Sequence, residues 1–503
     1  MQGKKEYSEK LFLSFQLSQK VPENNFYRRL KNSIDLHFVT QQTNPYYGTE
    51  GQQSIDPEVF FKLMLVGYLE NINSDRKIIE HASMRLDILF FIGYDIDEEL
   101  PWHSTLSRTR KLYGEEVFLS LFRKVLSLCI SKGMVSGKRQ AIDSAFVKAN
   151  ASMDSLEEKM MISDTQTYLD QLTENDEEKQ WPAEKKKKGN RRYSPTDADA
   201  RLSTKPGKPT QLNYSGQISV DTKNHVICGA MADFADKRDS QSLPAILATT
   251  VDNLKTQELT IEEVLADTNY SSGEALKALE FHKIKGYIPS FGLYKYNHEG
   301  FTYDVNSDSY MCSQGVQLTY RKTYTRLDGT IKKEYRTLRA NCKGCPLMST
   351  CLGKSHQKSI QHSIDKPYYD RMHERMQTRK GKRMRKLRQA TVEPVLGTLI
   401  NFLGMKRVNT RGIAQVNKHV LMAAIAYNLK KYMNYGHRYR NNMVMAEKRA
   451  FQRHSSSIYF GFILPIYQLL GINKSIFYQI KTAPCFTNLK CKQEDIPLTF
   501  FSY

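Results

Sequence analysis

Three acidic residues stand in contexts that suit metal-dependent chemistry. Asp143 follows Ala141 and Ile142 in the stretch RQAID, which we predict to be a buried strand that ends at the acid. Asp267 ends the apolar stretch IEEVLAD, and Glu393 lies in QATVEPVLGTLINFLG, a predicted apolar helix. An acid at the carboxyl end of a sheet strand points toward the crevice where such sheets bind ligands. Converging carboxylates repel each other unless a divalent cation lies between them.

The cation that such acids favour is Mg²⁺, which takes oxygen ligands and retains sites for a substrate phosphate. Two ions about 4 Å apart can activate an attacking oxygen and stabilise the leaving one. Mn²⁺ is the expected substitute. For each acid taken alone, the alternative is a helix cap or a salt bridge. The neighbouring acids Asp233, Asp236 and Asp239 are predicted to be structural or to support the metal ligands, and not to bind the metal ion directly.

Four cysteines fall in one polar segment, YMCSQG and NCKGCPLMSTC. They are Cys312, Cys342, Cys345 and Cys351. A CxxC pair with two further cysteines can hold a structural Zn²⁺ ion tetrahedrally, and free thiols are the alternative.

The chain is strongly basic. Its 503 residues include 74 Lys+Arg against 53 Asp+Glu, a net charge of +21. Such an excess predicts binding to a polyanion through neutralised phosphates. No apolar run reaches the ~20 residues of a spanning helix, so no membrane partner is expected. The cysteine content indicates a reducing compartment, and we expect a cytoplasmic, nucleoid-associated protein.

Hydrophobic periodicity divides the chain into five parts. Residues 1–135 read as a helical DNA-binding domain, and 136–295 as α/β sequence interrupted by a charged insertion at 153–208. Residues 296–365 read as an inserted cysteine-bearing module, 366–435 as further helices that carry Glu393, and 436–503 as a tail of unknown role. The pattern predicts an α+β or α/β fold with a mixed sheet flanked by helices.

Basic residues in three segments are candidates for DNA contacts, with solvated surface as the alternative. The first segment resembles a helix-turn-helix reader, the second is the basic half of the insertion, and the third precedes Glu393 with nine bases against one acid over 371–388. The candidates are Arg108, Arg110, Lys185, Lys186, Lys187, Arg191, Arg192, Arg385, Arg388 and Gln389.

Four stretches taken together resemble the DDE transposases of insertion sequences, in particular the group numbered eleven eighty-two. They are AIDSAFVKANAS, HVICGAMADFADKRDSQSLPAI, LADTNYSSGE and ATVEPVLGTLINFLGMKRVNTRG. The helical stretch SIDPEVFFKLMLVGYLENINSDRKIIEHASMRLDILFFIGYD resembles the N-terminal domain of that group.

The resemblance implies a ribonuclease-H-like fold in which Asp143, Asp267 and Glu393 bind two Mg²⁺ ions. It implies hydrolysis of double-stranded DNA at the terminal inverted repeats, then attack of the freed 3′-hydroxyl on target DNA by a homodimer. A related signature expects tyrosine, arginine and lysine where this chain has Lys386, Gln389 and Ile400. A hairpin mechanism that depends on that lysine is therefore in doubt.

Two alternatives remain open from the sequence. One is a catalytically silent, transposase-derived DNA-binding or regulatory protein. The other is a metal-dependent DNA nuclease that never joins strands.

Overall fold

The structure is a computed structural model of the 503-residue chain. It describes residues 16–458 except 49, 52, 159–191, 205–208, 293, 327–328, 354 and 356, and it describes side chains as far as residue 435. The chain divides into two compact units, residues 1–433 and 434–503. The first unit contains all three of the predicted acids.

The amino-terminal part is helical, as its periodicity predicts. Its helices are α1 (Leu17–Lys20), α2 (Phe26–Ser33), α3 (His37–Thr43), η1 (Asn44–Tyr46), α4 (Pro57–Leu69), α5 (Asp75–Ser83), α6 (Leu86–Ile92), α7 (His103–Leu112) and α8 (Glu115–Ser131). The Asp56 carboxylate caps α4 by accepting from the Glu58 N–H, and Pro57 stands at the first helical position. Phe60, Phe61 and Phe118 are fully buried in the interior of these helices.

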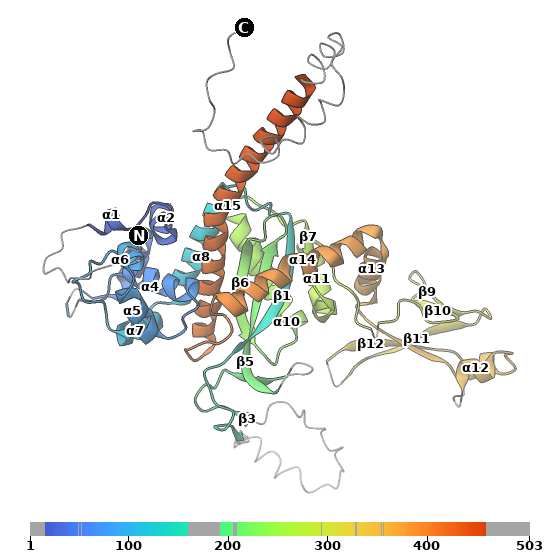
Figure 1. Ribbon diagram of the computed structural model, residues 1–503. Coiled ribbons are helices and arrows are strands. Elements are labelled where there is room, and N and C mark those ends of the chain that lie inside the picture. Colours follow the sequence, from blue (N-terminus) through green and yellow to red (C-terminus); the bar gives the residue numbers. More distant parts are fainter. Residues whose placement is uncertain are drawn as a thin grey trace, which may run out of the picture. The chain divides into compact units, whose positions relative to one another are not determined.

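A six-stranded mixed sheet follows (Figure 1). It contains β1 (Arg139–Lys148), β4 (Arg201–Ser203), β5 (Gln211–Asp221), β6 (Ile227–Phe234), β7 (Glu263–Leu265) and β8 (Lys285–Tyr287). β1 is central: it pairs antiparallel with β5 and parallel with β7, β5 pairs with β4 and β6, and β8 extends the sheet beyond β7. The mixed sheet with flanking helices confirms the predicted fold class, an α+β or α/β fold with a mixed sheet.

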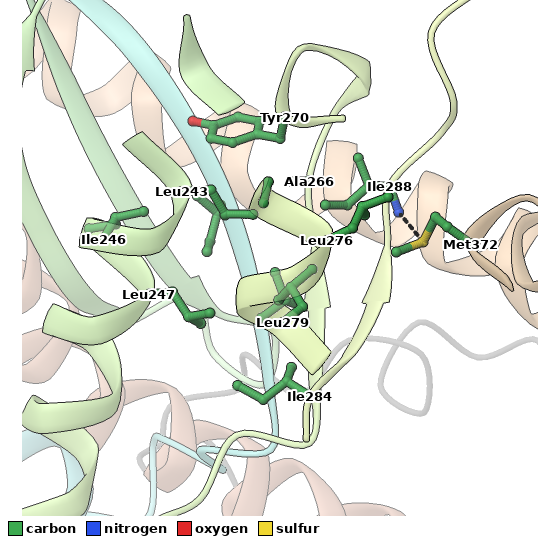
Figure 2. Packing of buried hydrophobic residues seen from close by; sticks show 13 residues of the cluster. Leu243, Ile246, Leu247, Ala266, Tyr270, Leu276, Leu279, Ile284, Ile288 and Met372 are labelled. Carbon is green, nitrogen blue, oxygen red and sulfur yellow. Dashed lines mark hydrogen bonds between the residues drawn. The ribbon is translucent and has the colours of Figure 1, made fainter. Parts of the chain in front are cut away.

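Helices cover both faces of this sheet. α10 (Asp239–Lys255) and α11 (Gly273–Phe281) lie on the face that Ile142 joins, and their apolar side chains fill one core with those of β7 and β8. Figure 2 shows Leu243, Leu276 and Met372 in this core, where the Met372 sulfur accepts from the Ile288 N–H at 3.4 Å. α13 (Lys366–Gln377) contributes Met372, which ties the later helices to the sheet.

The opposite face receives α14 (Arg379–Phe402) and the start of α15 (Ile413–Ile458). A Cβ on Gly216 of β5 would come within 2.5 Å of the Met405 methyl, so glycine permits the close approach of the connection between the two helices. α15 also covers the edge strand β6, because the Asn428 side chain bonds both the N–H and the C=O of Ile227. The backbone of α15 continues into the second unit.

The cysteine-bearing segment forms a five-stranded antiparallel sheet of its own. The strands are β9 (Phe301–Asp304), β10 (Ser309–Cys312), β11 (Gln317–Thr325), β12 (Ile331–Arg336) and β13 (Ser359–Ser363), with η3 (Arg339–Cys342) and α12 (Met348–Leu352) between β12 and β13. Tyr310, Leu318, Tyr335 and Ile360 form its small core. A further antiparallel pair, β2 (Glu157–Glu158) and β3 (Arg192–Tyr193), lies within the charged insertion at 153–208.

Within the described residues, no helix is both long enough and apolar enough to cross a membrane.

Candidate active site

Asp143 lies in the middle of β1 and not at its end. The prediction that the strand stops at the acid is wrong, because β1 continues to Lys148 while it pairs with β5 through Tyr214 and Asn213. Successive side chains of a strand point to opposite faces. Ile142 joins the core beneath α10 and α11, so Asp143 faces α14 on the other side of the sheet.

The Arg388 guanidinium joins two of the three predicted acids. Its Nη1 donates to Asp143 Oδ2 at 2.7 Å, and its Nη2 donates to Glu393 Oε1 at 3.3 Å. Side-chain exposure is 11% for Arg388, 17% for Asp143 and 56% for Glu393. Arg388 and Glu393 are both on α14, so this helix brings the third acid and its counter-charge to the sheet together.

Asp267 reaches the same place through strand register. β7 runs parallel to β1 with Leu265 beside Ala141, and two further residues along each strand lead to Asp267 and Asp143. Asp267 then begins the short η2 turn (Thr268–Tyr270), where its Oδ1 accepts from the Asn269 N–H at 2.9 Å. The acid is therefore fixed at the point where the chain leaves the sheet.

Burial and mutual repulsion disturb these carboxyl groups. Burial raises the pKa of Asp143 to about 6, with the Asp267 charge adding to the rise and the Ser144 N–H and the Arg388 guanidinium opposing it. Burial also raises the pKa of Asp267, again against the Arg388 charge. Both acids therefore respond to one guanidinium and lie where a further positive charge would stabilise their ionised forms.

A polar network supports the acids from the other face of the sheet. Ser144 Oγ donates to Asp239 Oδ1 at 2.7 Å, and Gln217 Nε2 donates to the same oxygen at 3.1 Å. The buried Tyr270 hydroxyl donates to Gln217 Oε1 at 2.5 Å. Asp239 is thus occupied by structural bonds, as predicted for this acid, while Gln217 and Tyr270 are residues that the sequence did not reveal. Tyr270 lies in the stretch LADTNYSSGE, next to Asp267, but nothing in that stretch indicates that its hydroxyl bonds Gln217.

The donor set suits a hard cation. Asp143 and Glu393 present carboxylate oxygens to one positive charge, and Asp267 stands next to Asp143 by register. Oxygen ligands of this kind are those Mg²⁺ takes. In the described part of the chain, no three acidic, thiol or imidazole side chains come close enough together to share one ion. Arg388 takes the position between two of the acids in this arrangement.

The predicted DNA contacts fall into three groups. Arg385 and Gln389 are exposed on α14, Arg108 is exposed on α7, and Arg192 is exposed on β3. Arg388 is instead bonded to the acids. Lys185, Lys186, Lys187 and Arg191 lie outside the described residues.

The structure contradicts the prediction that Arg110 contacts DNA. Its side chain is buried, and its Nη1 donates to the Asp75 carboxylate at 3.0 Å. A buried guanidinium with its own carboxylate partner cannot reach a DNA phosphate, so Arg110 joins α7 to α5.

The four module cysteines are free thiols. Cys312, Cys342, Cys345 and Cys351 all line one small cavity between the sheet and α12. Val316 N–H donates to Cys312 Sγ at 3.3 Å, and Cys342 Sγ donates to Thr337 Oγ1 at 3.3 Å. Because no three of the described thiols are near enough to hold one ion, the structure does not support the predicted zinc site.

Two family models match separate parts of the chain. Residues 15–112 match the family described as Transposase domain (DUF772), and residues 311–433 match the family described as Transposase DDE domain. No curated protein matches the chain. A solved structure, the cryo-EM structure of piggyBac transposase in a synaptic complex with hairpin DNA, is similar at 10% identity, with a TM-score of 0.30 over 81% of this chain and 72% of that chain.

The two family matches lie in the order expected for a transposase, and the second contains Glu393 and Arg388. Together the two matches support a DDE transposase of an insertion sequence. Its assignment to the group numbered eleven eighty-two stays a prediction.

Proposed function

We propose that this transposase cleaves double-stranded DNA at the terminal inverted repeats of an insertion sequence and joins the freed 3′ ends to target DNA. Asp143, Asp267 and Glu393 are the proposed catalytic residues and the ligands of two Mg²⁺ ions. The observation that carries the proposal is the Arg388 guanidinium bonded to Asp143 and Glu393, with Asp267 two residues beyond the last β1–β7 pair and near enough for its charge to act on Asp143. Carboxylates from three distant parts of the sequence thus face one positive charge.

The three acids differ in how firmly they are held. Asp143 is fixed by β5 and β7 on either side, and Asp267 is fixed by its own turn. Glu393 is the most exposed of the three and lies on a helix, so it is the one whose side chain can adjust to a substrate. When bound, the Mg²⁺ ions would supply Lewis acidity and a more acidic attacking water or hydroxyl.

The exposed face of α14 is the proposed path of the DNA strand next to the acids. Arg385 and Gln389 are exposed one turn apart on this helix, and Gln389 lies one turn before Glu393. Both side chains can therefore donate to phosphates on either side of the cleaved bond. We propose a homodimer on DNA, because two element ends must be cleaved and joined together, and we expect the protein to act at the nucleoid.

The test is a cleavage assay with duplex DNA that carries the element's terminal repeat. Asp143→Asn, Asp267→Asn and Glu393→Gln should each abolish Mg²⁺-dependent nicking and leave DNA binding intact. Glu262→Gln is the matched control, since this exposed acid just before β7 pairs only with Lys138 among the described residues. Undiminished cleavage by Asp143→Asn would overturn the assignment.

The same assay separates the alternatives. Binding without nicking in Mg²⁺ or Mn²⁺ by the unaltered chain would indicate a silent regulatory protein. Nicking without joining of pre-cleaved 3′ ends to a target plasmid would indicate a nuclease.

A further inference from the structure

A basic cavity opens at the carboxyl end of β1, apart from the three acids. It has a volume of about 610 Å³, and its charged lining residues are Lys148, Arg407 and Arg411. The remaining lining residues are neutral, and several can donate hydrogen bonds, including Asn150, Ser152, Thr196, Thr210 and Gln211. No acidic residue lines the cavity within the described part of the chain.

The backbone holds two of the three cations beside each other. Lys148 ends β1 and forms a parallel bridge with Arg407 in the connection between α14 and α15. The Lys148 N–H donates to the Lys406 C=O at 3.0 Å, and the Val408 N–H donates to the Lys148 C=O at 3.0 Å. Asn150 reinforces the bridge by donating to the Asn409 C=O at 2.9 Å. The two cations are therefore anchored on the sheet.

The positive charge of this cavity is not neutralised by the described residues. None of the three cations forms an ion pair with a described carboxylate, and all three side chains are exposed. Asp197 and Asp199 follow the lining residue Thr196 in the sequence, and they bond to the backbone at the start of α15: Asp197 accepts from the Gly412 N–H at 3.1 Å, and Asp199 accepts from the Ile413 N–H at 3.0 Å. Arg411 forms no ion pair with either acid or with any other described carboxylate.

The chemistry of the lining identifies the ligand class. Arginine presents a planar fork that matches phosphate oxygens, and lysine adds a point charge. Three cations spread over a wide, polar cavity without a carboxylate fit consecutive phosphates of a nucleic-acid backbone better than one small anion. A protein that binds single-stranded nucleic acid needs aromatic side chains on which the bases stack. No aromatic residue is in the described lining of this cavity, whose larger apolar residues are Met153 and Leu212.

We propose that the cavity lined by Lys148, Arg407 and Arg411 grips the phosphate backbone of duplex DNA beside the cleavage site. The proposal rests on the proposed function, because it takes Asp143 as the site of cleavage. Lys148 is five residues beyond Asp143 on β1, which separates their backbones by about 16 Å at ~3.3 Å per residue, and this odd separation makes the two side chains leave the strand on opposite faces. Successive phosphates of one DNA strand are spaced about 3.4 Å along the helix axis. The gripped phosphates therefore lie within about five base steps of the cleaved bond.

Fluorescence anisotropy on the full chain tests the proposal, with a 40-base-pair duplex that carries the element end and an unrelated duplex of equal length. The variant Arg407→Gln/Arg411→Gln should weaken binding to both duplexes about tenfold or more. It should also lower the slope of log K against log salt by about 0.9 for each phosphate that the variant no longer neutralises. The control Lys255→Gln/Lys285→Gln removes the same charge from exposed positions elsewhere on the sheet domain and should change neither quantity.

A second measurement locates the phosphates that the cavity binds. Neutral methylphosphonate groups placed about five base steps from the cleaved bond, away from the phosphates assigned to Arg385 and Gln389, should weaken binding by the unaltered chain and have little effect on Arg407→Gln/Arg411→Gln. The proposal would be overturned if Arg407→Gln/Arg411→Gln and Lys255→Gln/Lys285→Gln lost equal affinity for DNA. It would also be overturned if Arg407→Gln/Arg411→Gln kept a native melting temperature and bound DNA as tightly as the unaltered chain, or more tightly. Anisotropy measures binding and not cleavage. The cleavage assay with Asp143→Asn therefore tests the catalytic assignment independently of this proposal.

Discussion

Arg388 Nη1 lies 2.7 Å from Asp143 Oδ2, which joins two residues that are 245 positions apart in the chain. The same guanidinium reaches Glu393 Oε1 at 3.3 Å. An arginine in this position neutralises part of the repulsion among the acids and competes with any cation for their oxygens. The bond between Arg388 and Asp143 therefore stabilises the site in the absence of metal and lowers the affinity of the site for metal ions.

We expect Arg388→Ala to raise the affinity of the DNA-free chain for Mn²⁺ about tenfold, which corresponds to about 1.4 kcal/mol. The reason is that the carboxylates of Asp143 and Glu393 lose a competing positive charge. Titration with Mn²⁺ followed by electron paramagnetic resonance measures the affinity without any cleavage. Arg385→Ala, an exposed arginine on the same helix, is the control and should leave the affinity as it is. An equal or weaker affinity in Arg388→Ala would show that the guanidinium does not compete.

The buried pair between Arg110 and Asp75 predicts a loss of stability and not of DNA binding. Asp75→Ala leaves a buried guanidinium without its partner, which costs on the order of 3 kcal/mol. Chemical denaturation should show a lower free energy of unfolding for Asp75→Ala, with partial recovery in Asp75→Leu/Arg110→Met. The exposed Arg108, two residues away, gives the contrast: Arg108→Gln should keep the stability of the unaltered chain. A stable Arg110→Gln with weakened DNA binding would restore Arg110 as a DNA contact.

The sequence was sufficient for the elements but not for the contacts between them. The apolar stretch before Asp143 predicted the first part of β1, and hydrophobic periodicity predicted the helices of residues 1–135. The small polar residues after Asp143 were misleading, because Ser144 reads as a strand end until its bond to Asp239 is known. Polar side chains that find partners across a fold cannot be told from loop residues by local pattern alone.

Arg110 and Arg388 show the same limit for charged residues. Both lie in basic stretches, which indicate solvent or DNA, yet each is buried against an acid far away in the sequence. Helical spacing did carry a sign for Arg110, since it lies four residues after the buried Leu106 on one face of α7. Helical spacing gives no such indication for Arg388, because its partner Asp143 is on a strand and only tertiary packing brings the two together.

Tyr270 predicts an effect on the rate through the position of Asp267. Its hydroxyl bonds Gln217 beneath the sheet, and it closes the turn that Asp267 begins. Tyr270→Phe should lower the single-turnover cleavage rate about tenfold, cost about 1 kcal/mol of stability and leave the Kd for DNA unchanged. Tyr287→Phe, a buried tyrosine on β8 away from the acids, is the matched control. Equal cleavage rates in the two variants would assign Tyr270 to packing alone.

His419 predicts how stability depends on pH. This buried residue of α15 forms a hydrogen bond between its Nδ1 and the Tyr68 hydroxyl of α4, with the two atoms 2.7 Å apart. Burial, helped by the Arg110 charge, lowers its pKa to about 4, against about 6.5 in an unfolded chain. The unfolded state therefore binds a proton more readily, so the stability present above pH 6.5 is lost as the pH falls toward 4. At pH 5 the loss from this group is about 2 kcal/mol.

Melting curves at pH 7.5 and pH 5 compare the unaltered chain with His419→Gln. The variant should melt lower at pH 7.5, because it disturbs the packing of α15 on α4, and should lose less stability on going to pH 5. His282→Gln, at an exposed histidine after α11, should keep the pH response of the unaltered chain. An identical pH response in His419→Gln would mean that other groups account for the acid sensitivity, and that protonation of His419 does not control the contact between α4 and α15.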